Sequence, residues 1–532
     1  MRRAIDIARI SAKGSVILSL GMIISNLIMA LATFIIAGLL PRSDYGLYSV
    51  ILVVPSFFSL FQGLGTNSAI IKYVAQYRSE GKGREIRNIL THGLIFNLLV
   101  SILLAVASFL LADYLAGEVF RRPGVSFLIK VTSIGIFMTS MIAAFNSIFV
   151  GFERMEFNSL TMILQAVSKC LLSPTLILLG YGLLGVIMGD VASSTITAAF
   201  SFALFILYFY RRIASDGDDG LDLEGAGVKS PTSLYGTLNL MLRYGLPLSA
   251  STILNGILTQ FYNFMMAIYC SDVEIADYKM ATNFTVLINF FIFPISTVLF
   301  PAFSKLSIDR DRSTLRVVFQ SSVKYSALLV VPASVVVMAL SKPLVYTLFG
   351  EKFHDAPLYL SLIAISYLYV GVGRLTIDSL INGQGRTDVT LKLTLITLSV
   401  GVPLGLLLIP QYGIIGLIAT SLVSMVPGLV VGLWWVRRKF GISVDIASGV
   451  KIYISSGVAG LVTYLLNIYT SFTHWVSLAV GGAVFLLAYL IMILLVKAVD
   501  ENDIENMSDI SLGLGPLHKV INPILEVVKK LL

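Results

Sequence analysis

Apolar runs of about 20 residues or more recur along the whole chain, with short polar segments between them. A helix of about 20 apolar residues is long enough to cross roughly 30 Å of hydrocarbon. The pattern therefore predicts an all-α integral membrane protein of about fourteen transmembrane helices. The predicted spans lie near residues 14–40, 46–71, 88–112, 125–150, 157–179, 182–209, 245–269, 276–303, 323–340, 357–382, 388–409, 412–436, 448–468 and 474–496.

The composition agrees with lipid as the solvent. Of the 532 residues, 56% are hydrophobic and 13% are charged, against roughly 25% charged in a soluble domain. The first run has some features of a signal peptide. It is about 27 residues long without a clear small-residue cleavage site, so we expect it to remain as the first helix.

The distribution of the basic residues that give the net charge of +8 indicates the orientation of the protein in the membrane rather than a nucleic acid partner. With the N-terminus in the cytoplasm, 29 Lys and Arg residues fall in cytoplasmic segments and six in outer loops. This bias is the positive-inside rule, and it predicts a multi-pass protein of the cell membrane with both termini in the cytoplasm. The six outer residues are Arg42, Arg121, Arg122, Lys130, Lys342 and Lys352.

Two related halves are visible in the sequence. Residues 181–187 read YGLLGVI and residues 412–418 read YGIIGLI, while residues 146–155 match residues 378–387 at nearly the same offset. The repeat places six helices in each half with a shared orientation, so we expect two pseudo-symmetric lobes related by an axis along the membrane normal.

This repeat sets the predicted domain organisation. The linker between the lobes is rich in aspartate, which predicts a flexible cytoplasmic segment. The tail ends in an amphipathic pattern that is typical of a helix on the inner leaflet. The predicted parts are an N-lobe at 1–210, an acidic linker at 211–237, a C-lobe at 238–440, two further helices at 441–498 and a cytoplasmic tail at 499–532.

Polar positions recur at helical spacing in the first helix of each half. Such stripes indicate either a hydrophilic cavity lined by both lobes or hydrogen bonds between packed helices, which need no substrate. The two stripes consist of Ser15, Ser19, Asn26 and Thr33, and of Thr252, Asn255, Thr259 and Asn263.

Ionisable side chains inside predicted spans are costly and usually face a cavity or a partner. Arg374 and Asp378 lie four residues apart on one helix face; Arg374 is either a ligand for phosphate, which its planar donor fork matches, or an internal partner of Asp378. Lys169 and Asp190 lie at similar depth in neighbouring spans, which favours a structural pair. Lys279 lies near the outer end of its span, close enough to extend to the interface.

Two further roles are assigned from position. Lys72 and Lys305 are related by the repeat and lie at cytoplasmic helix ends, where they either recruit phosphate or seal an inner gate, or simply anchor the helices. Asp190 and Asp378 are candidates for coupling to a proton or ion, a role that requires a raised pKa.

Signals for catalysis, metals and cofactors are poor. The four histidines are scattered, and no phosphate-cradling loop of the Walker type is present. Cys170 and Cys270 lie in or beside separate spans and read as small apolar residues rather than a disulfide. We therefore predict a transporter without a cofactor or metal and not an enzyme.

Local patterns add a resemblance that covers the whole chain. They are Pro41, Asp44, Tyr45, Gly46 and Tyr48 around the start of the second span, the turn from Gly383 to Arg386, and the YG-x-x-G motifs that open the sixth and twelfth spans. With the six-plus-six-plus-two plan, these patterns resemble the polysaccharide transporter branch of the multidrug/oligosaccharidyl-lipid/polysaccharide (MOP) exporter superfamily, the Wzx-like flippases.

The resemblance implies a MATE/MurJ-like fold and a flippase. The expected substrate is an oligosaccharide on a polyprenyl phosphate or pyrophosphate, carried from the cytoplasmic to the outer leaflet by lobes that alternate around a central cavity. The expected partners are this substrate, membrane lipids and enzymes of glycan assembly. The cavity candidates are Asn26, Lys169, Asn255, Thr259, Asn263, Lys279, Arg374 and Asp378.

Three alternatives remain from the same plan. A multidrug exporter of the MATE branch typically has an acid in its first helix, and none lies between Ser15 and Leu40. A lipid II flippase often has arginines within its first two helices, whereas here the early arginines precede the first helix or follow it in the outer loop. A membrane enzyme of glycan assembly would normally need a sizeable loop bearing acids or basic clusters, which is absent.

Overall fold

The computed structural model describes residues 2–210, 233–306, 311–470 and 472–500, with 503 and 505. In these residues all regular structure is helical, because in hydrocarbon a helix satisfies its own backbone hydrogen bonds. The chain divides into two compact units. The first contains residues 1–279 and 405–417, and the second contains 280–404 and 418–532.

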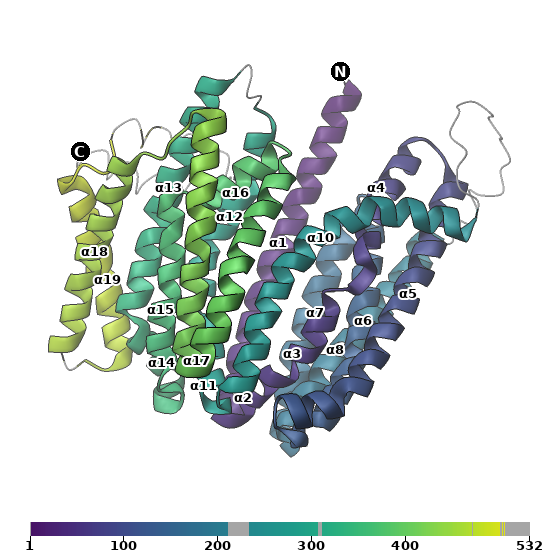
Figure 1. Ribbon diagram of the computed structural model, residues 1–532, viewed down its shortest axis with the longest axis horizontal. Helices are drawn as coiled ribbons and strands as arrows, with labels where there is room; N and C mark the ends of the chain where they lie inside the picture. The colour runs from purple at the N-terminus through teal and green to yellow at the C-terminus, as the bar shows by residue number, and fades with distance from the viewer. Residues whose placement is uncertain are drawn as a thin grey trace. The chain divides into compact units, whose positions relative to one another are not determined.

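The first unit contains most of the N-terminal half (Figure 1). Its helical segments are α1 (Arg2–Leu39), α2 (Arg42–Ile51), α3 (Val53–Ser59), η1 (Gln62–Gly65), α4 (Thr66–Ser79), α5 (Gly83–Tyr114), η2 (Leu115–Val119), η3 (Pro123–Val125), α6 (Ser126–Gly151), α7 (Met155–Leu176), η4 (Ile177–Tyr181), α8 (Gly182–Leu204), η5 (Phe205–Tyr210), α10 (Leu234–Tyr269) and the first turns of α11 (Asp272–Phe284).

Long helices pack side by side in this unit. The helix α1 lies along α7, α7 along α8, and α6 contacts both α5 and α8 (Figure 1). The helix α10 crosses α4 and η1 at close range, since a β-carbon on Gly65 would lie 2.1 Å from the carbonyl oxygen of Gly245. Only glycine permits this backbone approach, which fastens the first half of α10 to α4.

The second unit contains the remaining helices (Figure 1). They are α12 (Val286–Ser304), α13 (Arg312–Ala339), α14 (Ser341–Phe349), η6 (Gly350–Phe353), α15 (Ala356–Leu368), η7 (Tyr369–Val372), α16 (Arg374–Gly383), α17 (Thr387–Phe440, of which residues 405–417 belong to the first unit), α18 (Ile446–Tyr469) and α19 (His474–Leu495).

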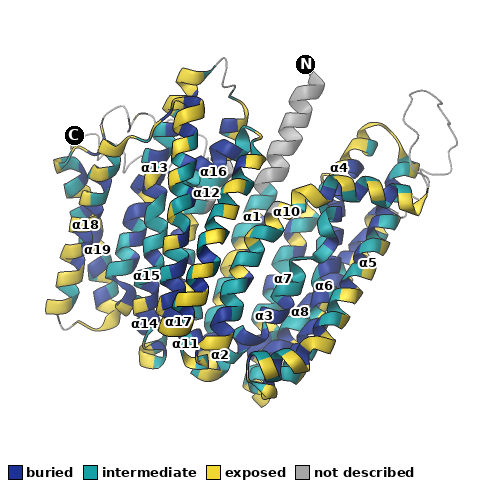
Figure 2. Cartoon of the chain, viewed as in Figure 1, coloured by how far each residue is buried: buried dark blue, intermediate teal, exposed yellow. Residues whose placement is uncertain are grey.

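The helix α13 forms the centre of the second unit, where it packs against α12, α15 and α18. The outward faces of α18 and α19 carry exposed apolar side chains, including Leu461, Leu487 and Leu495 (Figure 2). A protein in water rarely exposes apolar surface of this extent, so these faces indicate contact with lipid. Before α18, Asp445 accepts hydrogen bonds from Ser448 and from backbone N–H groups, which hold the pKa of its carboxyl below its usual range.

The predicted membrane fold is confirmed. Within the described residues, nine helices are long and apolar enough to cross a membrane, or ten with the bent pair Ala356–Val372 and Arg374–Gly383. Two of these helices, Met155–Phe209 and Thr387–Phe440, are 55 and 54 residues long, enough for two crossings each. Every predicted span lies on one helix or on consecutive helices.

Two of the predicted spans are broken rather than straight helices. The span at 46–71 is interrupted between α3 and α4, where Gly63, Leu64 and Gly65 have positive φ. The span at 357–382 bends by 54° before Arg374, where Gly373 has φ 94°. Glycine reaches these left-handed conformations without the steric cost of a β-carbon, and the helix ends there.

The backbone also repeats where the sequence does. Gly182 has φ 51° and ψ −129°, and its counterpart Gly413 has φ 54° and ψ −128°. The turn after α6 pairs Arg154 with Glu156 at 2.9 Å, and the turn after α16 pairs Arg386 with Asp388 at 2.9 Å. The lobe boundaries stay predictions, and most of the predicted linker and tail lies outside the described residues.

Candidate functional site

A buried ion pair lies inside the first unit. The Nζ atom of Lys169 on α7 is 2.7 Å from Oδ1 of Asp190 on α8, and both side chains are less than one fifth exposed. The hydroxyl of Tyr48 on α2 donates to Oδ2 of Asp190 at 2.5 Å and accepts from Lys169 at 3.0 Å. The predicted pairing of Lys169 with Asp190 is confirmed, and Tyr48 joins both partners.

This pair lies in the lining of a cavity of about 370 Å³ within the same unit. Hydroxyl and amide side chains share the lining with apolar ones, so the cavity offers many partners for water or a polar solute. The polar lining comprises Ser56, Ser59, Thr132, Thr139, Gln165, Lys169, Asp190, Ser193 and Ser194.

A second polar group connects α10 with α11. Lys279 donates to the side-chain oxygen of Asn263 at 3.2 Å, and Asn263 donates to Gln260 at 3.2 Å. Lys279 therefore has a hydrogen-bond partner one helix away rather than only the interface that a snorkelling side chain reaches. Two of the predicted cavity residues, Asn263 and Lys279, are thus brought together.

Several residues of the polar stripes are exposed or bond within their own helix. Asn26, Asn255 and Thr259 are exposed on the first unit, and Thr259 donates to the carbonyl of Asn255 in its own helix. In α1, Thr33 likewise bonds to its own helix at Met29. Asn263, in contrast, links α10 to α11 through Lys279, so the hydrophilic cavity and the packing of helices both stay predictions for these stripes.

Arg374 is the first residue of α16, directly after the bend at Gly373. It lies one turn from Asp378, but no hydrogen bond or ion pair joins the two side chains in the described part of the chain. Thr376, in the same first turn, has a fully buried hydroxyl without a hydrogen-bond partner among the described residues. The two opposite charges still interact across this turn, so the phosphate ligand and the internal pair both stay predictions for Arg374.

Lys72 and Lys305, the two predicted gate or phosphate-recruiting residues, have different surroundings. Lys72 is exposed in the middle of α4 rather than at a helix end, with its Nζ atom 3.9 Å from the ring centroid of Tyr244 and 5.0 Å from that of Tyr73. Lys305 is exposed directly after α12. Aromatic rings hold the Lys72 ammonium by cation–π attraction.

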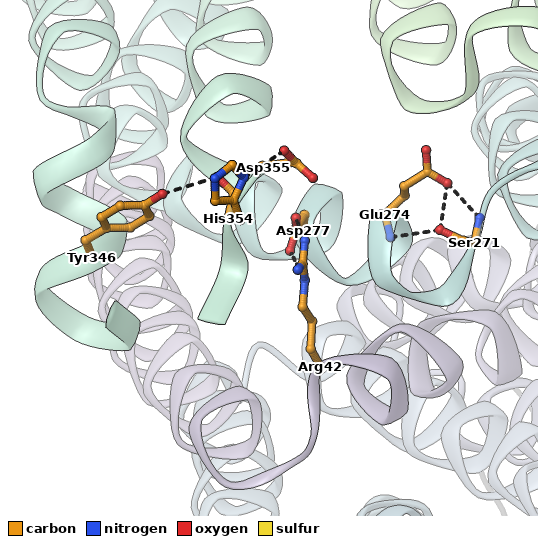
Figure 3. A network of polar contacts seen from close by, with 7 residues as sticks. All are labelled: Arg42, Ser271, Glu274, Asp277, Tyr346, His354 and Asp355. Atoms are coloured by element: carbon orange, nitrogen blue, oxygen red, sulfur yellow. Dashed lines mark hydrogen bonds and ion pairs between the residues drawn. The ribbon is translucent and has the colours of Figure 1, made fainter. Parts of the chain in front are cut away.

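Four charged residues that the sequence did not single out as site residues form a further cluster. Arg42, at the start of α2, makes a bidentate pair with Asp277 of α11, including an Nε to Oδ1 hydrogen bond of 2.9 Å (Figure 3). Asp277 is completely buried. Arg122 binds Asp272 at 2.6 Å. We call these four residues the clasp.

Arg122 also completes the end of α10. Its guanidinium donates to the carbonyls of Ala267 and Cys270, which belong to the final turn that lacks partners within the helix. The cation opposes the negative end of the helix dipole. The loop before α6 is thereby bound to the junction of α10 and α11.

Local sequence positions the acidic half of the clasp. Ser271 and Glu274 form a reciprocal capping box, in which Glu274 accepts from the backbone N–H of Ser271 at 2.9 Å (Figure 3). This box starts α11 and places Asp272 in its first turn and Asp277 further along it. The S-x-x-E spacing was a usable signal for this helix start, but no sequence signal indicated which arginines would reach it.

Gly46 is a testable part of this packing. A β-carbon there would lie 1.8 Å from the carbonyl oxygen of Asp272, so Gly46→Ala should push α2 away from α11 and lower the yield of folded protein in membranes several-fold. Gly457→Ala is the matched control, because nothing lies within 4 Å of that β-carbon and alanine favours a helix. Equal yields for the two variants would contradict the contact.

The fold and the polar groups define a multi-pass membrane transporter: apolar outside, with charged and polar side chains held at depth and a repeated backbone. Comparisons with known proteins agree. The family described as polysaccharide biosynthesis protein matches residues 11–307, and the MatE family matches residues 247–407. The chain belongs to the polysaccharide biosynthesis protein family and is a Wzx-like member of the MOP exporter superfamily.

Individual relatives support the same placement. The chain is 27% identical to the lipopolysaccharide biosynthesis protein WzxC of Escherichia coli strain K12 over 361 residues, 67% of each protein. The lipid II flippase MurJ in an inward closed conformation is 17% identical with a TM-score of 0.69, over 90% of this chain and 98% of MurJ. An inward-facing MATE family transporter is 20% identical with a TM-score of 0.64, over 80% and 98%. At these identities the two structures show the fold alone.

Proposed function

We propose that this protein is a flippase that carries a lipid-linked oligosaccharide, on a polyprenyl phosphate or pyrophosphate, from the cytoplasmic to the outer leaflet by alternating access. The observation that carries the proposal is Arg374: a guanidinium with no hydrogen bond or ion pair to the described residues, at the first position of a helix that begins at a bend inside a membrane span. Broken helices of this kind present their N-termini to anionic groups of transported substrates.

The chemistry at this helix start suits phosphate. The first N–H groups of α16 have no partner within the helix and lie at the positive end of its dipole, and the guanidinium adds a planar fork of donors. The Thr376 hydroxyl adds a buried polar atom without a partner among the described residues. Together these groups offer charge-assisted donors to a phosphate or pyrophosphate.

The other candidate residues would contact the rest of the substrate or act at the cytoplasmic side. Asn26, Asn255, Thr259, Asn263 and Lys279 would contact sugar hydroxyls and phosphate along α1, α10 and α11. Amide, hydroxyl and ammonium groups are suited to such contacts because each can donate hydrogen bonds to oxygen. Lys72 and Lys305 would recruit the phosphate at the cytoplasmic side or seal the inner gate.

Transport in one direction requires a ligand that binds the two states differently. Asp190, beside the cavity and bound to Lys169 and Tyr48, is one candidate for coupling to an ion gradient, and Asp378 is the other. Consumption of the glycan by assembly enzymes outside would serve the same end. We place the protein in the cell membrane with both termini in the cytoplasm.

The test is deletion of the gene followed by measurement of lipid-linked oligosaccharide in each leaflet. We expect the oligosaccharide to accumulate on the cytoplasmic leaflet and the surface glycan to disappear. The match to the MatE family over residues 247–407 favours a drug exporter as the second candidate. An exporter mutant would instead show drug sensitivity with normal glycan, and a lipid II flippase mutant would accumulate lipid II.

A further inference from the structure

The short helix α2 makes contacts of two kinds. Its first residue, Arg42, pairs with buried Asp277, and one turn later Gly46 packs on the backbone of Asp272. Tyr48 then reaches the buried Lys169–Asp190 pair. At 1.5 Å per residue, the clasp and the buried pair are only about 9 Å apart along the helix.

The helix α2 is suited to move as one rod. Pro41 separates it from α1 at the N-cap, and it ends at Leu52, before α3. Helical hydrogen bonds hold the ten residues between these two points. A displacement of Tyr48 therefore moves Arg42 and Gly46 with it.

Tyr48 forms hydrogen bonds with both residues of the buried Lys169–Asp190 pair. Its hydroxyl is a donor to Asp190 and an acceptor from Lys169 at the same time, and the residue is 7% exposed. A hydroxyl has one hydrogen to donate, so it can satisfy this arrangement only while the carboxylate accepts and the ammonium donates. A change in charge or position of either partner removes one of the two bonds.

We propose that Tyr48 is a positioning residue that couples the Lys169–Asp190 pair to the clasp, so that a change at the buried pair loosens Arg42 and Arg122 from α10 and α11. The clasp joins the α1–α2 junction, the loop before α6 and the α10–α11 junction. The distribution of Lys and Arg predicts that all three lie on the outer side of the membrane. Loosening of the clasp would open that side. The inference rests on the proposed transport function for its purpose, but its test requires no substrate.

A native cysteine, Cys270, can report opening of the clasp through its rate of chemical labelling. Cys270 contacts the clasp, because its backbone carbonyl accepts a hydrogen bond from Arg122 at 2.8 Å. The residue is 4% exposed. Replacing Cys170 with serine leaves Cys270 as the sole cysteine, because the sequence contains two. The rate at which a membrane-impermeant maleimide labels the full-length protein in membrane vesicles then measures clasp opening.

Arg122→Gln should raise the labelling rate roughly tenfold, since it removes charge-assisted hydrogen bonds. Arg121→Gln is the matched control, because the Arg121 side chain is exposed and makes no hydrogen bond or ion pair with the described residues. If Arg122→Gln labels at the rate of Arg121→Gln, the clasp does not hold this end closed and the inference is wrong.

Tyr48→Phe should also raise the rate several-fold while keeping the ring in place, and Tyr114→Phe, an exposed tyrosine, should not. Asp190→Asn should act in the same direction, and combining it with Tyr48→Phe should add little, because both break the same link. Wild-type labelling in both single variants would overturn the coupling, as would effects that simply add.

Thermal unfolding of each variant separates loosening of the clasp from general loss of structure. A variant that unfolds near the wild-type temperature and labels faster supports the inference. Faster labelling of Tyr48→Phe that tracks a lower unfolding temperature contradicts it. Loss of surface glycan with unchanged labelling would leave the flippase proposal standing and remove only the coupling.

Discussion

Replacing Arg374 with alanine is expected to abolish complementation of a flippase-deficient strain at normal protein level. The guanidinium makes no hydrogen bond or ion pair with the described residues, so we expect its removal to leave the fold intact and to remove a phosphate ligand. Truncating one partner of a buried, hydrogen-bonded charge pair costs about 2–5 kcal/mol of binding, which is at least roughly thirtyfold in affinity. The measurement is surface glycan, normalised to the amount of protein in the membrane.

Two variants sharpen this test. Arg374→Lys keeps the charge but loses the planar fork, so partial complementation is expected. Arg316→Ala removes an exposed arginine of α13 in the same unit and should complement fully. Wild-type glycan in the Arg374→Ala strain would eliminate the proposed role of this residue.

Asp190→Asn is expected to destabilise the protein by about 3 kcal/mol, because it leaves the Lys169 ammonium largely buried without its counter-ion. Lys169→Met should cost a similar amount for the converse reason. The double variant should be less destabilised than the two effects added together, since it removes both charges. Unfolding of the purified full-length protein in detergent measures these differences.

An exposed ion pair provides the control. Lys130 and Asp113 lie 2.7 Å apart, but the Asp113 side chain is 68% exposed. Asp113→Asn should therefore change stability little, because solvent screens an exposed pair. If Asp190→Asn is no more destabilising than Asp113→Asn, the Lys169–Asp190 pair contributes no more than a surface pair does.

The sequence was most informative about long-range regularities. Apolar runs locate spans because a backbone in hydrocarbon must satisfy its own hydrogen bonds. The repeat predicted shared local geometry, and Gly182 and Gly413 do share an unusual backbone conformation. Pairing of Lys169 with Asp190 was predictable because two opposite charges at similar depth have few other partners.

The broken helices were not predicted. An apolar run has the same appearance whether its helix is straight or bent, and glycine is also common inside straight membrane helices. The positive φ at Gly65 and Gly373 depends on what packs around each break. The bend is what places Arg374 at a helix start, a feature that the spacing of Arg374 and Asp378 could not indicate.

By itself the sequence determined the membrane class, the positions of the apolar spans and the repeat, because hydropathy and periodicity are properties of the chain alone. Apart from the Lys169–Asp190 pair, only the tertiary structure decided which polar groups meet. Arg42 and Asp277 are 235 residues apart, and Tyr48 finds Asp190 142 residues away. Contacts at such separation depend on helix packing and on close backbone approaches such as Gly46 on Asp272, which no local pattern encodes.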